Sequence, residues 1–411
     1  MPDLCCLARK LKILACFVFL PTVLLAGCAA KDAALVPAEL VAFESTAHIK
    51  TAWHSSLDGN ARSTGIGPFK SGRVYSRPLF GGGNYERFYL ALQDDTLFAV
   101  TKKGRVFAVN KKNGKRLWRV DLKREISAGI SLQGNTLFVA TIKGQVLALS
   151  ADDGKVLWTA QATTEVIAPP QSNGREVLVS AIDGRLFAFN ADTGEKLWNY
   201  DHPQPLLTFR SQASPLLVGR QAFIAFDNGQ LLSFGTRNGD LKWATRVSQP
   251  QGITELERAV DLDVTPVADG PFIYAAGANG RIVAVTKGTG KISWAEDASI
   301  FNELSLNDDA VFYVDENSHV FSRRLSSGTK TWESDVLHRR GVGSPSVVGE
   351  FLAMIDSYNM LQVLDAQTGK LAARRPLLGN GYASPLLVDG DTIYTLSNNG
   401  SLSAYRIIAK K

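Results

Sequence analysis

Residues that could carry catalysis or hold a metal ion are sparse and scattered in this 411-residue chain. The five histidines never take the short spacings of a zinc site. They are His48, His54, His202, His319 and His338. The Gly-x-Ser-x-Gly turn of a nucleophilic serine and a glycine-rich phosphate loop are also missing. The sequence therefore predicts no catalytic residue, no metal site and no cofactor.

Two stretches carry residue types suited to binding another protein. The first, residues 202–212, contains Leu207, Phe209 and Arg210. An aromatic ring and an arginine among aliphatic side chains are the composition of a protein-interface hot spot. The alternative is that Leu207 and Phe209 are buried under their own loop.

The second stretch, residues 248–263, ends with Asp261 and Asp263, which alternate along a short segment. Their carboxylates could accept hydrogen bonds from a lysine or arginine of a partner. They could equally hold the loop in place by pairing with Arg210 or Arg258. The spacing alone leaves both roles open.

These stretches interrupt a repeat that returns about every forty residues. Each copy reads Gly-x-apolar-x-apolar, then about five residues, then Gly-x-x-x-Trp. The clear copies are Gly104–Trp118, Gly144–Trp158, Gly184–Trp198, Gly229–Trp243 and Gly280–Trp294, with weaker copies at Ser318–Trp332 and Asn359–Ala373. A period of this length indicates stacked supersecondary units.

One copy predicts a pair of β-strands. Apolar and polar residues alternate in its first half, which is typical of a half-buried strand. A turn such as Asn-Gly or Thr-Gly follows, and a second short strand ends on Trp. Another strand pair precedes each copy, so every unit holds four antiparallel strands. Such units arranged radially form a β-propeller, in which the repeated Trp is expected to be a packing anchor between blades.

The two ends of the chain are expected to complete one blade together. The last copy begins at Gly400 and lacks its Gly-x-x-x-Trp strand, whereas Trp53 near the front belongs to no copy. Since an open ring would leave exposed strand edges, the N-terminal strand around Trp53 is predicted to close it. The fold predicted is an all-β, eight-bladed β-propeller of four-stranded antiparallel blades. A seven-bladed ring with an extra hairpin is the alternative.

The spacing of the tryptophans places the two interrupting stretches. Trp-to-Trp intervals are 40, 40, 45, 51 and 38 residues, and the two long intervals are adjacent. Both insertions join the Trp-bearing strand of one blade to the first strand of the next. They are therefore expected to emerge side by side on the same face, and insertions in such folds are often binding loops.

The first residues are typical of a lipoprotein leader. Arg9, Lys10 and Lys12 precede an apolar core, and a lipobox-like Leu-Leu-Ala-Gly leads to Cys28. We expect a signal peptide over residues 1–27, a lipidated tether over 28–45 and the propeller over 46–411. An ordinary cleaved signal with an incidental cysteine is the alternative. The remaining charge, about +4, is spread over the repeats and does not indicate nucleic-acid binding.

The chain resembles the BamB family, propeller lipoproteins of the outer-membrane β-barrel assembly machinery. The resemblance covers the lipobox, the eight repeats of the type shared with quinoprotein propellers, and both insertions. The more specific segments are Leu206–Pro215, Thr254–Val267 and Asp335–Val347. It implies an outer-membrane lipoprotein that faces the periplasm and has no enzymatic activity. The residue after Cys28 is Ala29, and a non-acidic residue there goes with transport to the outer membrane.

The same resemblance implies the partner. In the family the two adjacent loops contact the periplasmic POTRA region of BamA, and through it the protein joins the other subunits. The family's Leu-x-Leu-Arg pattern falls on Leu207, Phe209 and Arg210, with Phe209 replacing an aliphatic residue. Its Asp-x-Asp pattern falls on Asp261 and Asp263. The implied role is to support the folding and insertion of outer-membrane proteins, with binding of unfolded clients along blade edges as a weaker expectation.

Two other classes are disfavoured. A quinone-dependent dehydrogenase on the same propeller typically has a vicinal cysteine pair near its cofactor. The only such pair here, Cys5–Cys6, lies in the expected leader. A periplasmic sensor or adhesin would need a different targeting signal or an attached domain.

Overall fold

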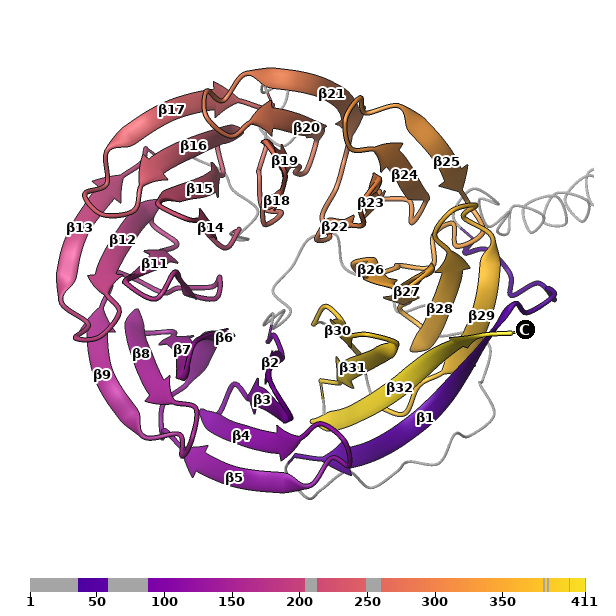
Figure 1. Cartoon of the computed structure of the whole chain (residues 1–411), viewed down its shortest axis with the longest axis horizontal. Coiled ribbons are helices and arrows are strands. Elements are labelled where there is room, and N and C mark those ends of the chain that lie inside the picture. Colours follow the sequence, from indigo (N-terminus) through magenta and orange to yellow (C-terminus); the bar gives the residue numbers. More distant parts are fainter. Residues whose placement is uncertain are drawn as a thin grey trace, which may run out of the picture. The chain divides into compact units, whose positions relative to one another are not determined.

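The computed structural model describes residues 36–57, 88–203, 213–248, 260–379, 381–382, 384–398 and 400–410. The chain divides into two compact units, Met1–Pro37 and Ala38–Lys411. The second unit is a ring of β-sheets (Figure 1). Within the described ranges, no helix has the length and hydropathy needed to cross a membrane.

The ring consists of four-stranded antiparallel sheets, which we number as blades in chain order. Blade 1 contains β2 (Ala91–Gln93), β3 (Thr96–Val100), β4 (Arg105–Asn110) and β5 (Arg116–Asp121). Blade 2 contains β6 (Ile126–Gln133), β7 (Thr136–Thr141), β8 (Gln145–Ser150) and β9 (Val156–Gln161). Blade 3 contains β10 (Gln171–Ser172), β11 (Glu176–Ser180), β12 (Arg185–Asn190) and β13 (Lys196–Asp201). Blade 4 contains β14 (Leu216–Val218), β15 (Gln221–Phe226), β16 (Gln230–Gly235) and β17 (Leu241–Arg246).

The second half of the ring follows the same plan. Blade 5 contains β18 (Val267–Asp269), β19 (Phe272–Ala275), β20 (Gly280–Thr286) and β21 (Ile292–Ala298). Blade 6 contains β22 (Ser305–Leu306), β23 (Ala310–Val314), β24 (Val320–Arg324) and β25 (Lys330–Ser334). Blade 7 contains β26 (Ser346–Val348), β27 (Phe351–Ile355), β28 (Met360–Asp365) and β29 (Leu371–Pro376). Blade 8 contains β30 (Leu387–Asp389), β31 (Thr392–Leu396), β32 (Ser401–Ala409) and β1 (Ala47–Ser56).

Blade 8 confirms the predicted ring closure. Its outer strand is β1, which pairs antiparallel with β32 from Ala47↔Ala409 to Ser56↔Ser401. The eight sheets confirm the eight-bladed propeller and rule out a seven-bladed ring with an extra hairpin. The first and last of the described strands thus share one sheet (Figure 1), and its outer edge would lack a strand without β1.

The repeated Trp and Gly form the contact between neighbouring blades. The Nε1 of Trp158 in blade 2 donates to the carbonyl of Ala191 in blade 3 at 2.8 Å. Under the same ring lies Gly194, where an added Cβ would be 2.6 Å from the indole. Gly194 also has a φ of 74°, which side-chain-bearing residues rarely adopt. The Gly-x-x-x-Trp motif therefore supplies both halves of a contact that links successive blades.

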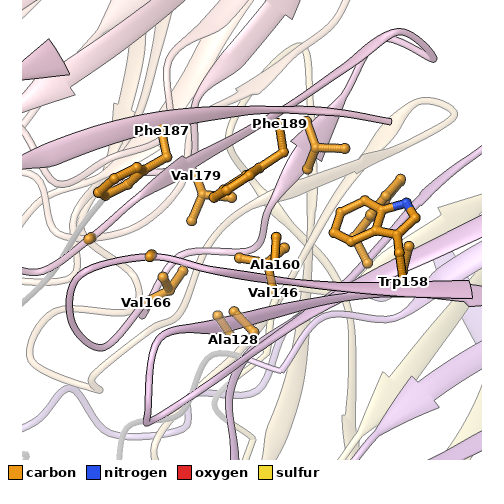
Figure 2. Close-up of a cluster of buried hydrophobic side chains, with 14 of the residues drawn as sticks. Ala128, Val146, Trp158, Ala160, Val166, Val179, Phe187 and Phe189 are labelled. Atoms are coloured by element: carbon orange, nitrogen blue, oxygen red, sulfur yellow. The ribbon is translucent and has the colours of Figure 1, made fainter. Parts of the chain in front are cut away.

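Apolar side chains fill the space between blades. Figure 2 shows one such cluster, in which Trp158 and Val146 of blade 2 lie near Phe187 and Phe189 of blade 3. Alternate residues of each middle strand face opposite neighbouring blades. The half-buried strand that the sequence predicts is therefore wrong, because a strand such as β4 packs against a blade on each side and is buried on both faces. This burial supplies the main stabilisation of the ring.

A second detail of the predicted strands is also wrong. The outer strand of a blade does not end on its Trp: β5 continues from Trp118 to Asp121. The reason is pairing, because Asp121 lies opposite Arg105 at the start of β4 and the whole length of β4 is thereby covered.

The missing Trp at Ala373 also has a structural cause. Each Trp contacts the hairpin between the third and fourth strands of the following blade. In blade 8 these strands are β32 and β1, which come from opposite ends of the chain and have no hairpin between them. A Trp at position 373 would have no such hairpin to contact, and the buried Ala373 packs there instead.

The alternation of strands defines two faces of the ring. Each blade runs from its inner strand to its outer strand, and neighbouring strands are antiparallel. The connections from one blade to the next and the turns between the second and third strands therefore lie on one face. We call this the connection face. The turns between the third and fourth strands lie on the other, which we call the hairpin face.

Candidate functional site

The candidate binding residues fall on the connections flanking blade 4. Asp261 and Asp263 precede β18 and so belong to the connection between blades 4 and 5. Leu207, Phe209 and Arg210 belong to the connection between blades 3 and 4, within residues 204–212, which lie outside the described residues. Cys28 also lies outside them. The strands that flank both connections end and begin at the connection face.

Asp261 and Asp263 are packed into the chain. Their exposed fractions are 1% and 3%. The backbone carbonyl of Asp261 accepts a hydrogen bond from the amide of Ala278 in blade 5 at 2.9 Å. Gly277 allows this approach, since a Cβ there would be 2.0 Å from the same carbonyl oxygen. These contacts hold the connection against blade 5 through the backbone of Asp261, whereas Arg210 and Arg258, the pairing partners considered for the carboxylates, lie outside the described residues.

A third carboxylate, Asp227, lies close enough to Asp263 for their charges to interact. Asp227 follows β15 at the turn between the second and third strands of blade 4. Burial, together with the like charge of Asp263, raises the pKa of Asp227 to about 7. The turn of blade 4 and the end of the second insertion are therefore electrostatically coupled.

The first insertion begins at the same turn. His202 follows β13, and its ring centroid lies 4.1 Å from that of Phe226, the residue before Asp227. Burial lowers the pKa of His202, while the nearby Asn228 side chain opposes that shift. The imidazole is thus a packed, largely neutral ring at neutral pH rather than an exposed cation.

The turn Phe226–Asn228 is where the two insertions meet. His202 opens the first insertion, and its ring packs against Phe226. Asp263 closes the second insertion, and its charge adds to the effect of burial in raising the pKa of Asp227. The sequence analysis missed the turn, because Asp227-Asn228-Gly229 has the composition of any tight turn in the repeat. Its position between the two longest intervals was the available signal.

A second polar network lies where the blades approach the ring axis. Glu303, before β22, accepts hydrogen bonds from the amide of Thr265 at 2.9 Å and from the hydroxyl of Tyr89 at 3.1 Å. Its own amide donates to Ser344 Oγ at 3.0 Å. These bonds tie blades 5, 6 and 7 together and reach blade 1, which is not their neighbour. They hold the inner ends of the connections in fixed positions.

No metal centre is found in the part of the chain that the structure describes, where His, Cys, Asp and Glu form no group of three or more suited to an ion. Two of the dispersed histidines do meet. Nε2 of His319 and Nδ1 of His338 are 2.8 Å apart, and Nδ1 of His319 lies 3.5 Å from Asp315. The pair links blade 6 to the connection that follows it.

Comparison with known proteins gives one consistent family. A sequence model described as outer membrane protein assembly factor BamB matches residues 102–334 and 323–410. A relative of that description from Alkalilimnicola ehrlichii is 45% identical over 318 residues, or 77% of this chain and 83% of the relative. One from Pseudomonas aeruginosa is 37% identical over 373 residues, or 91% of this chain and 93% of the relative. Against the Legionella pneumophila relative the match spans about half of it, 53%, at 31% identity.

Solved structures agree on the fold. The crystal structure of BamB from Moraxella catarrhalis superposes with a TM-score of 0.72 at 25% identity, covering 77% of this chain and 95% of that chain. A quinohemoprotein alcohol dehydrogenase from Pseudomonas putida gives a TM-score of 0.65 at 11% identity, covering 88% of this chain and 77% of that chain. The second likeness shows only that the propeller is shared.

Proposed function

Because the chain belongs to the family of outer membrane protein assembly factor BamB, we propose that it is a non-enzymatic scaffold of outer-membrane protein assembly. It binds the periplasmic POTRA region of BamA, and through BamA the other subunits. In doing so it supports the folding and membrane insertion of outer-membrane proteins. The relatives' names, which describe assembly factors, support this role over that of a dehydrogenase.

The observation that carries the proposal is the meeting of both insertions at blade 4. The His202 ring packs against Phe226, and an added Cβ at Gly229 would lie 3.3 Å from Val260, so the described ends of both insertions lie at the same turn of blade 4. A patch built from two neighbouring connections offers a partner apolar side chains, an arginine and carboxylates together. We assign Leu207, Phe209 and Arg210 as the contacting residues of this patch.

Asp261 and Asp263 take a different part in the proposed site. Since both are buried, they hold the second connection in the shape that BamA recognises, and local opening on binding would bring their carboxylates to a cationic partner residue. The two roles are compatible, because a carboxylate that holds a loop in the free protein can accept a new donor in the complex.

We further propose that Cys28 is lipidated after removal of residues 1–27 and that residues 28–45 tether the propeller of residues 46–411. The protein is then anchored in the outer membrane and faces the periplasm. Acyl anchoring by more than one chain would make this attachment stable.

Site-specific photo-crosslinking at Phe209 tests the patch. A photoreactive residue there should trap BamA, whereas one at Lys112 on the hairpin face of blade 1 should not. Lys112 is a suitable control because it is exposed and lies in the turn between β4 and β5. Trapping at both positions, or at neither while the protein is folded, would contradict the proposed patch.

The aspartates need a substitution rather than a probe, because a bulky group at a buried position would disrupt the fold. Asp261→Asn and Asp263→Asn should weaken binding to purified POTRA domains by about tenfold, corresponding to one lost charge-assisted hydrogen bond. Asp192→Asn, in an exposed turn on the hairpin face, is the matched control. Equal affinity in all three variants would remove the aspartates from the site.

A further inference from the structure

The residues before β1 are bound along the outside of blade 7. We call residues 38–46 the strap. Its first residue, Ala38, donates its amide hydrogen to the carbonyl of His338 at 2.9 Å. Its last residue, Thr46, donates to the carbonyl of Ala372 in β29 at 3.0 Å and accepts from the amide of Lys410 at 2.8 Å. Both ends of the strap are therefore fixed to the propeller by backbone hydrogen bonds.

Arg340 fixes the first end. Its guanidinium donates to the carbonyl of Ala38 at 3.0 Å. The same group is held by Asp356 in a two-nitrogen ion pair at 2.7 and 2.8 Å, and it stacks over the ring of Tyr358 at 4.7 Å. The Arg340 and Asp356 side chains are only 6% and 0% exposed. A buried arginine that is pre-oriented in this way has little conformational freedom left to lose when it binds the strap.

Arg374 fixes the middle. It donates to the carbonyl of Val41 at 3.3 Å, and its guanidinium lies over the ring of Phe43 at 5.2 Å. Gln362, its cross-strand partner, accepts from Arg374 at 3.0 Å and donates to Asp356 at 2.9 Å. Asp356 thus orients Arg340 directly and Arg374 through Gln362. Together these side chains form a binding site for the extended strap.

The direction of the strap follows from these contacts. His338 and Arg340 belong to the connection between blades 6 and 7, on the connection face. Ala372 lies near the start of β29, at the hairpin face, where β1 begins at Ala47 opposite Ala409. The chain therefore joins the propeller at the connection face and crosses blade 7 to the opposite face before entering blade 8.

We infer that the strap makes the connection face the membrane-proximal face of the propeller. This inference rests on the anchoring at Cys28 in the proposed function. Ala38 lies ten positions after Cys28, and this segment spans about 35 Å at most. If the strap were released, the free tether would extend to Ala47 and reach about 65 Å. Arg340 and Arg374 thus halve the reach of the tether and select the face that stays close to the bilayer.

Proteolysis tests whether the strap is bound. A glutamate-specific protease can cut after Glu39 and Glu44. In the full chain purified in detergent, these bonds should resist cleavage, and in an Arg340→Ala/Arg374→Ala variant they should be cut about tenfold faster or more, because cleavage follows the population of the released strap. Phe43→Ala is a second variant that leaves the buried Asp356 paired. Leu40→Ala, whose side chain is 46% exposed, is the matched control. Equally rapid cleavage in the wild type and all variants would overturn the inference.

Energy transfer to labelled lipids tests the membrane-proximal face. Donor dyes are placed singly at Asp335→Cys, on the connection face beside blade 7, and at Gln367→Cys, on its hairpin face. In liposomes the dye at position 335 should transfer more efficiently, and the difference should shrink in the Phe43→Ala variant. A more efficient transfer from position 367 would refute the assigned orientation. Absence of transfer from both positions would instead refute lipid anchoring, and neither result depends on binding to BamA.

Discussion

The rim of the ring and the connection face at blade 4 are built on opposite plans. At the rim, one contact recurs: a Trp of one blade donates to a carbonyl of the next and covers its glycine, as Trp198 does with Thr236 and Gly239. At the connection face of blade 4, the intervals lengthen and buried carboxylates lie near one another, with Asp227 and Asp263 close enough to interact. The rim thus repeats one aromatic packing contact from blade to blade, whereas the connection face at blade 4 contains buried carboxylates.

The difference between these two regions distinguishes contacts that stabilise the fold from features that need another explanation. A repeated contact is explained by the need to stack identical units, so it says little about partners. Buried carboxylates that repel one another reduce stability and need a different explanation. The partner-binding surface proposed above would supply that explanation.

Removing the closing contact should have the largest effect. Trp53 donates to the carbonyl of Lys111 at 2.7 Å and covers Gly114, which joins blade 8 to blade 1. Trp53→Ala should lower the free energy of unfolding by about 3–5 kcal/mol, as expected for loss of a large buried aromatic ring. Urea denaturation measures it. Trp198→Ala, the same contact within continuous chain, is the control; if only the control is destabilised, ring closure by β1 contributes little.

The opposite substitution tests why one blade lacks the contact. Ala373→Trp restores the repeat in the sequence, but blade 8 has no hairpin to receive the indole. We expect destabilisation by about 1–3 kcal/mol from overpacking, measured in the same urea experiment. A gain in stability would mean that the Trp contact does not need the hairpin.

Much of the fold could be predicted from the sequence because its determinants are local and repeated. Alternating strands, turn glycines and the Trp spacing were each visible in single copies. Even closure could be inferred from the unmatched Trp53. Two features could not be predicted: the extended outer strand and the absence of a Trp at position 373. Both depend on pairing between strands that a single copy of the repeat does not contain.

The site could be predicted only in part. The lengthened intervals located the insertions, and the strands that flank them end and begin at the same face. The burial of Asp261 and Asp263 could not be predicted, because it depends on contacts with blade 5, such as the bond from Ala278. Asp227 was missed for the same reason: its turn looks ordinary, and only its approach to Asp263 distinguishes it.

The smallest effect expected concerns Asp227 and depends on pH. Its pKa is raised to about 7 from an ordinary 3.8, so between these values the folded chain holds a proton that the unfolded chain has released. Stability contributed by this proton is therefore lost as pH rises from about 4 to 7. Asp227→Asn removes the titration, so its unfolding free energy relative to wild type should rise between pH 5 and pH 8, by on the order of 1–2 kcal/mol once partial solvation is allowed for. Asp192→Asn should show no such trend. A flat difference for Asp227→Asn would mean that neither burial nor the charge of Asp263 raises the pKa of Asp227, and the contrast between rim and connection face would lose its electrostatic basis.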